Sequence, residues 1–237
     1  MITTLVGEAL SVIGCAKREQ PTVPELFRQD RRHIDLLPLI EPHSDPTAAL
    51  LDVGCGDGRL LRILHDRGWT DLHGCDWRAP ANVASMPWLR FNCCDLNAEG
   101  LEQYPDQAFH TVICSEVLEH VENPAAVLRN ISRILTPAGQ CVITLPNACN
   151  FFERLVFLAT GNSTRYRSER ESGPWSHISL FTSKTLESLL DRAGLIVVTE
   201  GTSAIFWGGY FFFPKHRFGR LWSYSASWVV QKQLPVS

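Results

Sequence analysis

The chain has 237 residues, with 22 Lys and Arg against 25 Asp and Glu, and a formal net charge of −3. This length suits one α/β domain spanning residues 1–237, and the interspersed charges exclude the broad basic surface that duplex nucleic acid requires. No apolar run reaches the ~20 residues of a membrane span, and eight cysteines without a Cys-x-x-Cys pair indicate free thiols in a reducing cytoplasm.

Residues 1–47 precede the first predicted strand, and we expect them to form a cap or packed arm with a helix-like stretch at His33–Ile40. From residue 48 onward, short apolar runs alternate with amphipathic stretches, which predicts a parallel sheet covered by helices on both faces. The predicted strands are Leu50–Val53, Leu72–Cys75, Leu89–Cys94, Thr111–Ser115, Cys141–Leu145, Leu195–Thr199 and Ser227–Gln231. The predicted helices are Gly58–Arg67, Pro124–Leu135, and one that Thr182 or Ser183 caps and that ends at Arg192.

The first strand runs into a glycine-rich turn, Asp52-Val-Gly54-Cys55-Gly56-Asp57-Gly58. Glycine allows the backbone to turn sharply and to approach a ligand closely. The spacing is G-x-G-x-G, whereas dinucleotide-binding turns have G-x-G-x-x-G. Carboxylates on both sides of the turn would repel a pyrophosphate and attract a ligand that carries an ammonium and a sulfonium. The turn therefore predicts a site for S-adenosylmethionine, and Asp57 is expected to cap the following helix.

This turn resembles the first motif of class I S-adenosylmethionine-dependent methyltransferases. Further segments follow in the order and spacing of that family, over about residues 48–200: His73–Asp76, Cys94–Leu96, Ser115–Val121, Leu135–Gly139 and His177–Thr182. Within the family, the chain looks most similar to the small-molecule branch that includes ubiquinone-biosynthesis O-methyltransferases. The resemblance implies a Rossmann-like, doubly wound, seven-stranded α/β sheet of order 3-2-1-4-5-7-6 with the last strand antiparallel. Thr136-Pro-Ala-Gly139 stands where the family usually has a Pro-Gly-Gly turn, and a turn can still form there.

The cofactor is then expected to lie at the carboxyl ends of the first strands, within a core of residues 48–146. The expected cofactor-binding residues are Asp52, Gly54, Cys55, Gly56, Gly58, Asp76, Trp77, Asp95, Leu96, Ser115 and Glu116. Asp76 lies about 20 residues after the glycine turn, where an acidic ribose ligand is expected, although a solvated turn residue would look the same. The resemblance implies that Asp95 accepts a hydrogen bond from the adenine amino group and that Leu96 packs on the ring. The alternative for Asp95 is a turn cap.

The segment Ser115-Glu116-Val-Leu-Glu119-His120 ends the fourth strand, where methyl transfer is expected. An oxygen acceptor must lose its proton, and histidine suits that role, so the candidate catalytic residues are His120 and then His177. The alternative is that these side chains only order the loop. In relatives that resemble this chain at Glu-x-x-Glu-His, the motif holds Mg²⁺, which here would involve Glu116, Glu119, His120 and His177. Other relatives need no metal, and we expect none here.

The acceptor is expected to contact residues 147–181, an insertion, and the C-terminal part of the sheet in residues 182–237. Arg154, Arg165, Arg167 and Arg170 could clamp an anion, but interleaved glutamates favour a solvated face. The aromatic stretch 206–222 could line an acceptor pocket, belong to the core, or contact a membrane surface near Lys215 and Arg217. We expect a cytoplasmic methyltransferase acting on oxygen of a small molecule, apolar or aromatic in part. The alternatives are an RNA-methylating enzyme, a catalytically silent binding protein and, disfavoured by the glycine spacing, an NAD-dependent oxidoreductase; the oligomeric state stays open.

Overall fold

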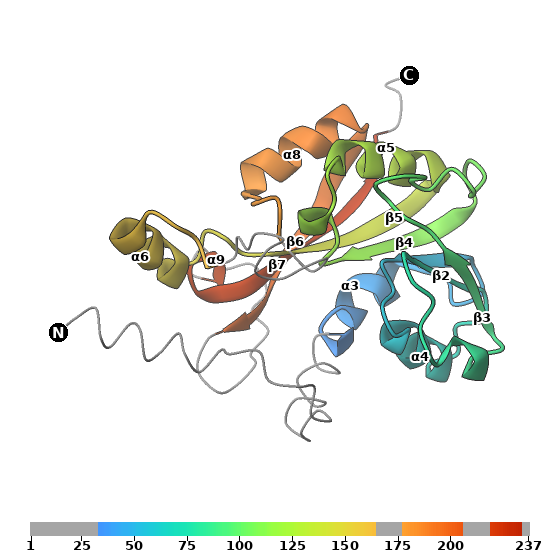
Figure 1. Cartoon of the computed structure of the whole chain (residues 1–237). Coiled ribbons are helices and arrows are strands. Elements are labelled where there is room, and N and C mark those ends of the chain that lie inside the picture. The colour runs from blue at the N-terminus through green and yellow to red at the C-terminus, as the bar shows by residue number, and fades with distance from the viewer. Residues whose placement is uncertain (1–32, 165–176, 206–218, 234–237) are drawn as a thin grey trace.

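The computed structural model describes residues 33–164, 177–205 and 219–233 (Figure 1). Its centre is a seven-stranded sheet of order β3-β2-β1-β4-β5-β7-β6. The strands are β1 (Leu50–Val53), β2 (Leu72–Asp76), β3 (Leu89–Cys93), β4 (Phe109–Ser115), β5 (Leu135–Pro146), β6 (Leu195–Ile205) and β7 (Ser223–Lys232). Strands β1 to β5 pair in parallel, and β7 pairs antiparallel with both β5 and β6. The predicted fold class, strand order and antiparallel last strand are confirmed.

Helices cover both faces of the sheet, as a doubly wound fold requires. On one face lie α3 (Leu37–Ile40) and α4 (Arg59–Asp66), and on the other α5 (Pro124–Ile134) and α8 (Ser183–Arg192) (Figure 1). The pleat of β1 serves both layers: Leu50 packs with α3 and α4, whereas Leu51 and Val53 pack with α5 and α8. Short 3-10 helices complete the connections: Glu41–His43, Val83–Ser85 and Leu118–His120 (η3).

The sequence placed most helix ends well. The Asn123 side chain accepts a hydrogen bond from the Ala126 backbone N–H, and Pro124 opens α5. Thr182, one of the two predicted caps, caps α8, and it does so in a capping box with Thr185. One predicted cap is wrong, because the N-cap of α4 is Gly58 and not Asp57. The Asp57 carboxylate instead accepts from the Arg59 backbone N–H at 3.1 Å, because the left-handed Gly58 (φ 73°) separates it from the helix by one residue.

The larger differences lie beyond the fourth strand. β5 begins at Leu135, not Cys141, and Leu135 pairs with Phe109 while Gln140 pairs with Thr111. The predicted turn at 136–139 is thus an irregularity inside β5, and a bulge tolerates the missing N–H of Pro137. The insertion contains an unpredicted helix, α6 (Phe151–Thr160). β6 and β7 are longer than predicted, and α9 (Gly219–Trp222) precedes β7.

Several expectations fall outside the described residues. These are the cap or packed arm expected over the first residues, as far as residue 32, and the roles suggested for Arg165, Arg167 and Arg170 and for the aromatic stretch over residues 206–218 with Lys215 and Arg217. At the N-terminal side, the stretch expected to be helical from His33 to Ile40 is helical at His33 and Ile34 and again in α3 from Leu37, with a turn at Asp35 and Leu36 between them. Among the described helices, none combines the length and the apolar character that crossing a membrane would require.

Candidate active site

The glycine turn after β1 has the conformation that its sequence predicts. Gly54, Gly56 and Gly58 all have positive φ, at 72°, 56° and 73°, a region that side chains rarely adopt. At Gly54 there is a second constraint, since a Cβ atom would lie 2.5 Å from Cγ2 of Val117. The backbone N–H groups of Gly54 and Cys55 both donate to the Cys75 carbonyl, at 2.8 and 3.0 Å. The turn is therefore fixed against both β2 and the segment that follows β4.

Two carboxylates flank this turn from neighbouring strands. Asp76, the last residue of β2, accepts a hydrogen bond at Oδ2 from the Gly56 backbone N–H, at 2.9 Å. Asp52 on β1 is only 4% exposed. Burial, and secondarily the charge of Asp76, raises the pKa of Asp52 to about 8. Cys55 is buried within the turn itself. The turn thus has the half-buried carboxylate of Asp76 on one side and the buried carboxyl group of Asp52 on the other.

The residues predicted for the adenosine moiety lie at adjacent strand ends. Trp77 follows β2 with 43% of its surface exposed, and the Arg78 guanidinium lies 4.3 Å from its ring centroid. Asp95 follows β3 and accepts from the Asn97 backbone N–H at 2.9 Å, so its alternative as a turn cap is present in the structure. Leu96 is half-buried against the core. The four residues predicted there therefore lie at or just after the carboxyl ends of two adjacent strands, β2 and β3.

A polar network marks the end of β4. Ser115 Oγ lies 2.8 Å from Thr144 Oγ1 on β5. Glu116 has a left-handed backbone, with φ 55°, and such a conformation costs on the order of 1–2 kcal/mol in a residue with a side chain. Its carboxylate Oε1 accepts from Ser225 Oγ on β7 at 3.0 Å and from Thr144 Oγ1 at 3.4 Å. Sequence reasoning missed Ser225, which is 109 residues from Glu116 and belongs to no local motif.

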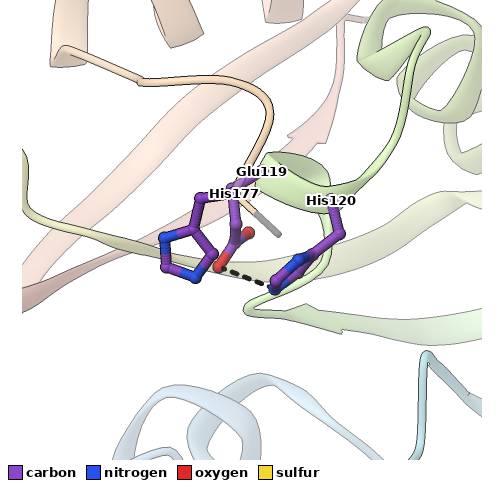
Figure 2. A group of neighbouring side chains, drawn as sticks. All are labelled: Glu119, His120 and His177. Carbon is purple, nitrogen blue, oxygen red and sulfur yellow. Dashed lines mark ion pairs between the residues drawn. The ribbon is translucent and has the colours of Figure 1, made fainter. Parts of the chain in front are cut away.

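The two predicted catalytic histidines meet at a buried glutamate (Figure 2). Glu119 in η3 is 1% exposed, and His120 Nε2 lies 3.9 Å from its Oε1. The rings of His120 and His177 are 4.8 Å apart between centroids. His177 comes from the segment before α8, which is held here because the backbone N–H groups of Ile178 and Ser179 donate to the Glu119 carbonyl at 2.9 and 3.2 Å.

This cluster has the chemistry of a divalent-cation site. One ligand atom from each of Glu119, His120 and His177 lies within 4.8 Å of the others. Within the described residues, neither carboxylate oxygen of Glu119 has a hydrogen-bond partner. Burial, with a further contribution from the charge of Glu116, raises the pKa of Glu119 to about 9. A buried carboxylate beside two imidazoles fits a cation or a protonated imidazole as its partner.

Comparison with known proteins agrees with this geometry. The family model of a methyltransferase domain matches residues 26–200, and the fold and glycine turn are those of the class I enzymes that use S-adenosylmethionine. The chain belongs to the methyltransferase domain family and is an S-adenosylmethionine-dependent methyltransferase. The predicted family and cofactor are therefore confirmed.

Curated relatives and solved structures extend the comparison. The chain is 30% identical over 156 residues to "Ubiquinone biosynthesis O-methyltransferase" of Pseudomonas fluorescens (strain Pf0-1), covering 59% of this chain and 67% of that protein. A structure described as a SAM dependent methyltransferase from Archaeoglobus fulgidus matches with a TM-score of 0.62 at 16% identity, covering 89% of this chain and all of that one. The 1,6-didemethyltoxoflavin-N1-methyltransferase of Burkholderia thailandensis, with bound 1,6-didemethyltoxoflavin and S-adenosylhomocysteine, matches with a TM-score of 0.54 at 14% identity, covering 93% and 94% of the two chains. At these identities, the structural matches show the shared fold.

Proposed function

We propose that this methyltransferase transfers the methyl group of S-adenosylmethionine to an oxygen atom of a small-molecule acceptor. The observation that carries the proposal is the cluster of Glu119, His120 and His177 at the carboxyl edge of the sheet, beside the end of β4. An oxygen acceptor needs a base or a cation near its hydroxyl group, and this cluster supplies either. The curated relatives, which are named as O-methyltransferases, support the same reaction class.

The proposal assigns the cofactor to the carboxyl ends of β1 to β4. Asp52 orients the methionyl end, Asp76 accepts from the ribose hydroxyls, and Asp95 accepts from the adenine amino group. The turn residues Gly54, Cys55, Gly56 and Gly58 enclose the ligand, with Trp77 and Leu96 beside the adenosine and Ser115 and Glu116 toward the methyl group. The hydrogen bond between Gly56 and Asp76 supports this assignment, because it joins the turn to the ribose ligand before the cofactor binds.

The reaction is an in-line displacement at carbon. A lone pair of the acceptor oxygen forms the new C–O bond while the C–S bond breaks, and its electron pair leaves with sulfur as a neutral thioether. The hydroxyl proton passes to an imidazole nitrogen of His120 or His177. Positioning supplies much of the rate. Glu119, 3.9 Å from His120, favours the imidazolium that forms.

A divalent cation would be held by Glu119, His120 and His177. When bound, such a cation lowers the pKa of a coordinated hydroxyl group. In that case the protein's own contribution is the alignment of Glu119 by η3 and of His177 by its backbone bonds to η3. Acceptor contacts would then come from residues 147–181 and 182–237. We place the reaction in a reducing compartment, the cytoplasm, in keeping with the free thiols of the described cysteines.

Calorimetric binding of S-adenosylmethionine and S-adenosylhomocysteine, with NAD as a control, tests the cofactor site in the wild type and in Asp76→Ala. Methyl transfer is then assayed with four acceptors, each in the presence of Mg²⁺ or of EDTA. They are catechol, its mono-O-methyl ether, and the corresponding amine and thiol. Products are identified by mass spectrometry. His120→Ala and His177→Ala should bind the cofactor but form no O-methyl product. The control His65→Ala, on α4, should bind the cofactor and still form the product. Methylation of nitrogen or sulfur alone would contradict the proposal, and binding without turnover on any acceptor would indicate a catalytically silent protein.

A further inference from the structure

Two buried cysteines lie at the ends of adjacent strands, each next to a carboxylate of the proposed cofactor site. Cys75 precedes Asp76 at the end of β2. Cys94 follows β3 directly and precedes Asp95. β2 and β3 pair in parallel, with Asp76 opposite Cys93, and the Cys94 backbone N–H donates to the Asp76 carbonyl at 2.9 Å. A change in the distance between Cys75 and Cys94 therefore acts on the backbone that carries both carboxylates.

The thiol groups of Cys75 and Cys94 are in contact. Both side chains are buried in the hydrophobic cluster that the sheet forms with α5 and α8. Both thiols are free, and that of Cys75 donates a hydrogen bond to the sulfur of Cys94. A disulfide has an S–S bond of about 2.05 Å, so its formation requires these two sulfur atoms to approach one another further.

The two thiols differ in acidity, as the two members of a reactive pair should. The hydrogen bond from Cys75 is the main cause that lowers the pKa of Cys94 to about 7. The same bond, together with burial, raises the pKa of Cys75 well above its usual value. Because the thiolate is the nucleophilic form of cysteine, Cys94 is the thiol that meets an oxidant first, and Cys75 is the thiol that then attacks Cys94.

A surface turn covers Cys94 and depends on its thiol. Cys94 is 2% exposed, but Asp95 and residues 97–99 in the turn after it are exposed. The Cys94 thiol donates to the Gly100 carbonyl at 2.6 Å, and the Gly100 backbone N–H donates to the Asp95 carbonyl at 3.2 Å. A small, uncharged oxidant needs to displace only this turn to reach Cys94. Oxidation of Cys94 removes the thiol hydrogen and therefore the bond to Gly100.

We propose that Cys75 and Cys94 are a redox-sensitive pair, which a peroxide oxidises to a disulfide that weakens the binding of S-adenosylmethionine. The effect on binding rests on the proposed function, which assigns Asp76 to the ribose and Asp95 to the adenine. The disulfide draws the ends of β2 and β3 together and releases the turn that carries Asp95. The two carboxylates then no longer have the spacing that one adenosine moiety requires.

The oxidation takes two steps. The Cys94 thiolate attacks hydrogen peroxide: an S–O bond forms, the O–O bond breaks, and the hydroxide that leaves takes up the proton that Cys94 released. The sulfur of Cys75 then attacks the sulfenic acid of Cys94. An S–S bond forms, the S–O bond breaks, and hydroxide leaves as water with the Cys75 thiol proton. Two thiols are thus oxidised while one peroxide is reduced to two water molecules, and a dithiol reductant reverses the change by thiol–disulfide exchange.

The test starts from the full chain, reduced with dithiothreitol, freed of the reductant and treated with hydrogen peroxide. We expect its intact mass to fall by that of two hydrogen atoms, and a proteolytic digest to contain Cys75 and Cys94 in one disulfide-linked pair of peptides. In calorimetry, the affinity for S-adenosylhomocysteine should fall by about tenfold or more, the effect of losing one hydrogen bond to a charged group. Dithiothreitol should restore the affinity.

Serine variants separate this pair from the other thiols. Cys75→Ser and Cys94→Ser should bind S-adenosylhomocysteine as the reduced wild type does, and should keep that affinity after peroxide. The matched control is Cys93→Ser, because Cys93 is the exposed neighbour of Cys94 and this variant should stay sensitive to peroxide. The peptide mapping is done on the wild type, so it decides whether the disulfide forms even where a buried substitution impairs folding.

Three outcomes would overturn the proposal. The first is the absence of a disulfide between Cys75 and Cys94 after treatment with peroxide. The second is a disulfide that leaves the affinity for S-adenosylhomocysteine unchanged. The third is an equal loss of affinity in peroxide-treated Cys94→Ser, which would assign the loss to another residue. Failure of the proposed cofactor site is distinguished by the reduced wild type: if that protein does not bind S-adenosylhomocysteine, the site and the effect on binding are both contradicted, whatever the mapping shows of the disulfide.

Discussion

Asp52 permits a quantitative test of the cofactor site. Its carboxyl group is 4% exposed on β1, and burial, with a smaller contribution from Asp76, raises its pKa from 3.8 to about 8. At neutral pH the folded protein therefore holds a proton on Asp52 that the unfolded chain releases. A carboxyl whose pKa is raised by folding costs nothing below its unfolded pKa. Its cost grows as the pH rises and is complete at the folded pKa. Asp52 should thus lower stability progressively between about pH 4 and about pH 8.

The magnitude follows from the distance between the working pH and the unfolded pKa. Each pH unit contributes about 1.4 kcal/mol, so at pH 7 the cost of Asp52 is on the order of 4 kcal/mol. Asp52→Asn keeps the shape of the side chain and removes the ionisation. We expect its free energy of unfolding in urea to exceed that of the wild type by up to about 4 kcal/mol at pH 7, and the difference to shrink toward zero at pH 4.

Asp52→Asn should also weaken the binding of the cofactor. S-adenosylmethionine carries a positive ammonium, which favours the ionised form of Asp52, so binding should release up to one proton at pH 7. Affinity should then increase by up to tenfold per pH unit below pH 8. Calorimetry in phosphate and in Tris measures the proton release from the difference in apparent enthalpy. Equal release in the wild type and in Asp52→Asn, or identical pH dependence of their unfolding, would refute the reasoning.

Three further predictions concern neighbouring residues. Gly54→Ala should lower the free energy of unfolding by about 2–4 kcal/mol through its left-handed φ and its contact with Val117, and adding Val117→Ala should return part of that loss in a urea double-mutant cycle. Glu119→Gln should be more stable than the wild type at pH 7, because it removes a carboxyl whose pKa burial raises to about 9. Glu119→Gln should also lose any stabilisation by Mn²⁺ in thermal scans. A ligand at a hundred times its Kd stabilises a protein by about 2.7 kcal/mol, so a loss of that size is measurable. Ser225→Ala should reduce kcat about tenfold while the Kd for the cofactor stays within twofold. Ser227→Ala, on the same strand, is its control. Equal effects of the two substitutions would contradict a role for the contact between Ser225 and Glu116.

The first half of the fold could be predicted because its signals are local. The apolar run Leu50–Val53, the turn that follows it and the amphipathic α5 each carry a pattern that packing cannot easily override. The strand order was available only through the resemblance to a family, since periodicity does not say which strands pair. The irregular start of β5 was not predictable, because Thr136-Pro-Ala-Gly139 reads as a turn, and only its pairing with β4 shows that the strand continues around it.

The candidate site likewise has some features that the sequence predicted and others that it did not. His120 and His177 were predicted as candidate bases because histidine suits the removal of a proton from an oxygen acceptor, and the structure brings both to Glu119. The contact of Glu116 with Ser225 was missed because it joins residues 109 positions apart across β7, and no short motif encodes it. Helix α6 was missed for a different reason. Its apolar residues lack the one-sided spacing that distinguishes a surface helix in a sequence.

The carboxyl edge of the sheet carries two buried acids, Asp52 and Glu119, and burial is the main cause of the raised pKa of each. The ionised form of neither carboxyl group stabilises the free protein. Ionisation of each becomes favourable once a positive charge lies beside it. For Asp52 that charge is the ammonium of the cofactor, and for Glu119 it is an imidazolium or a divalent cation. Stability and activity are therefore opposed at this edge. Asp52→Asn and Glu119→Gln should be among the more stable variants of this enzyme and among the least active, which is the combination that distinguishes a functional carboxylate from a structural one.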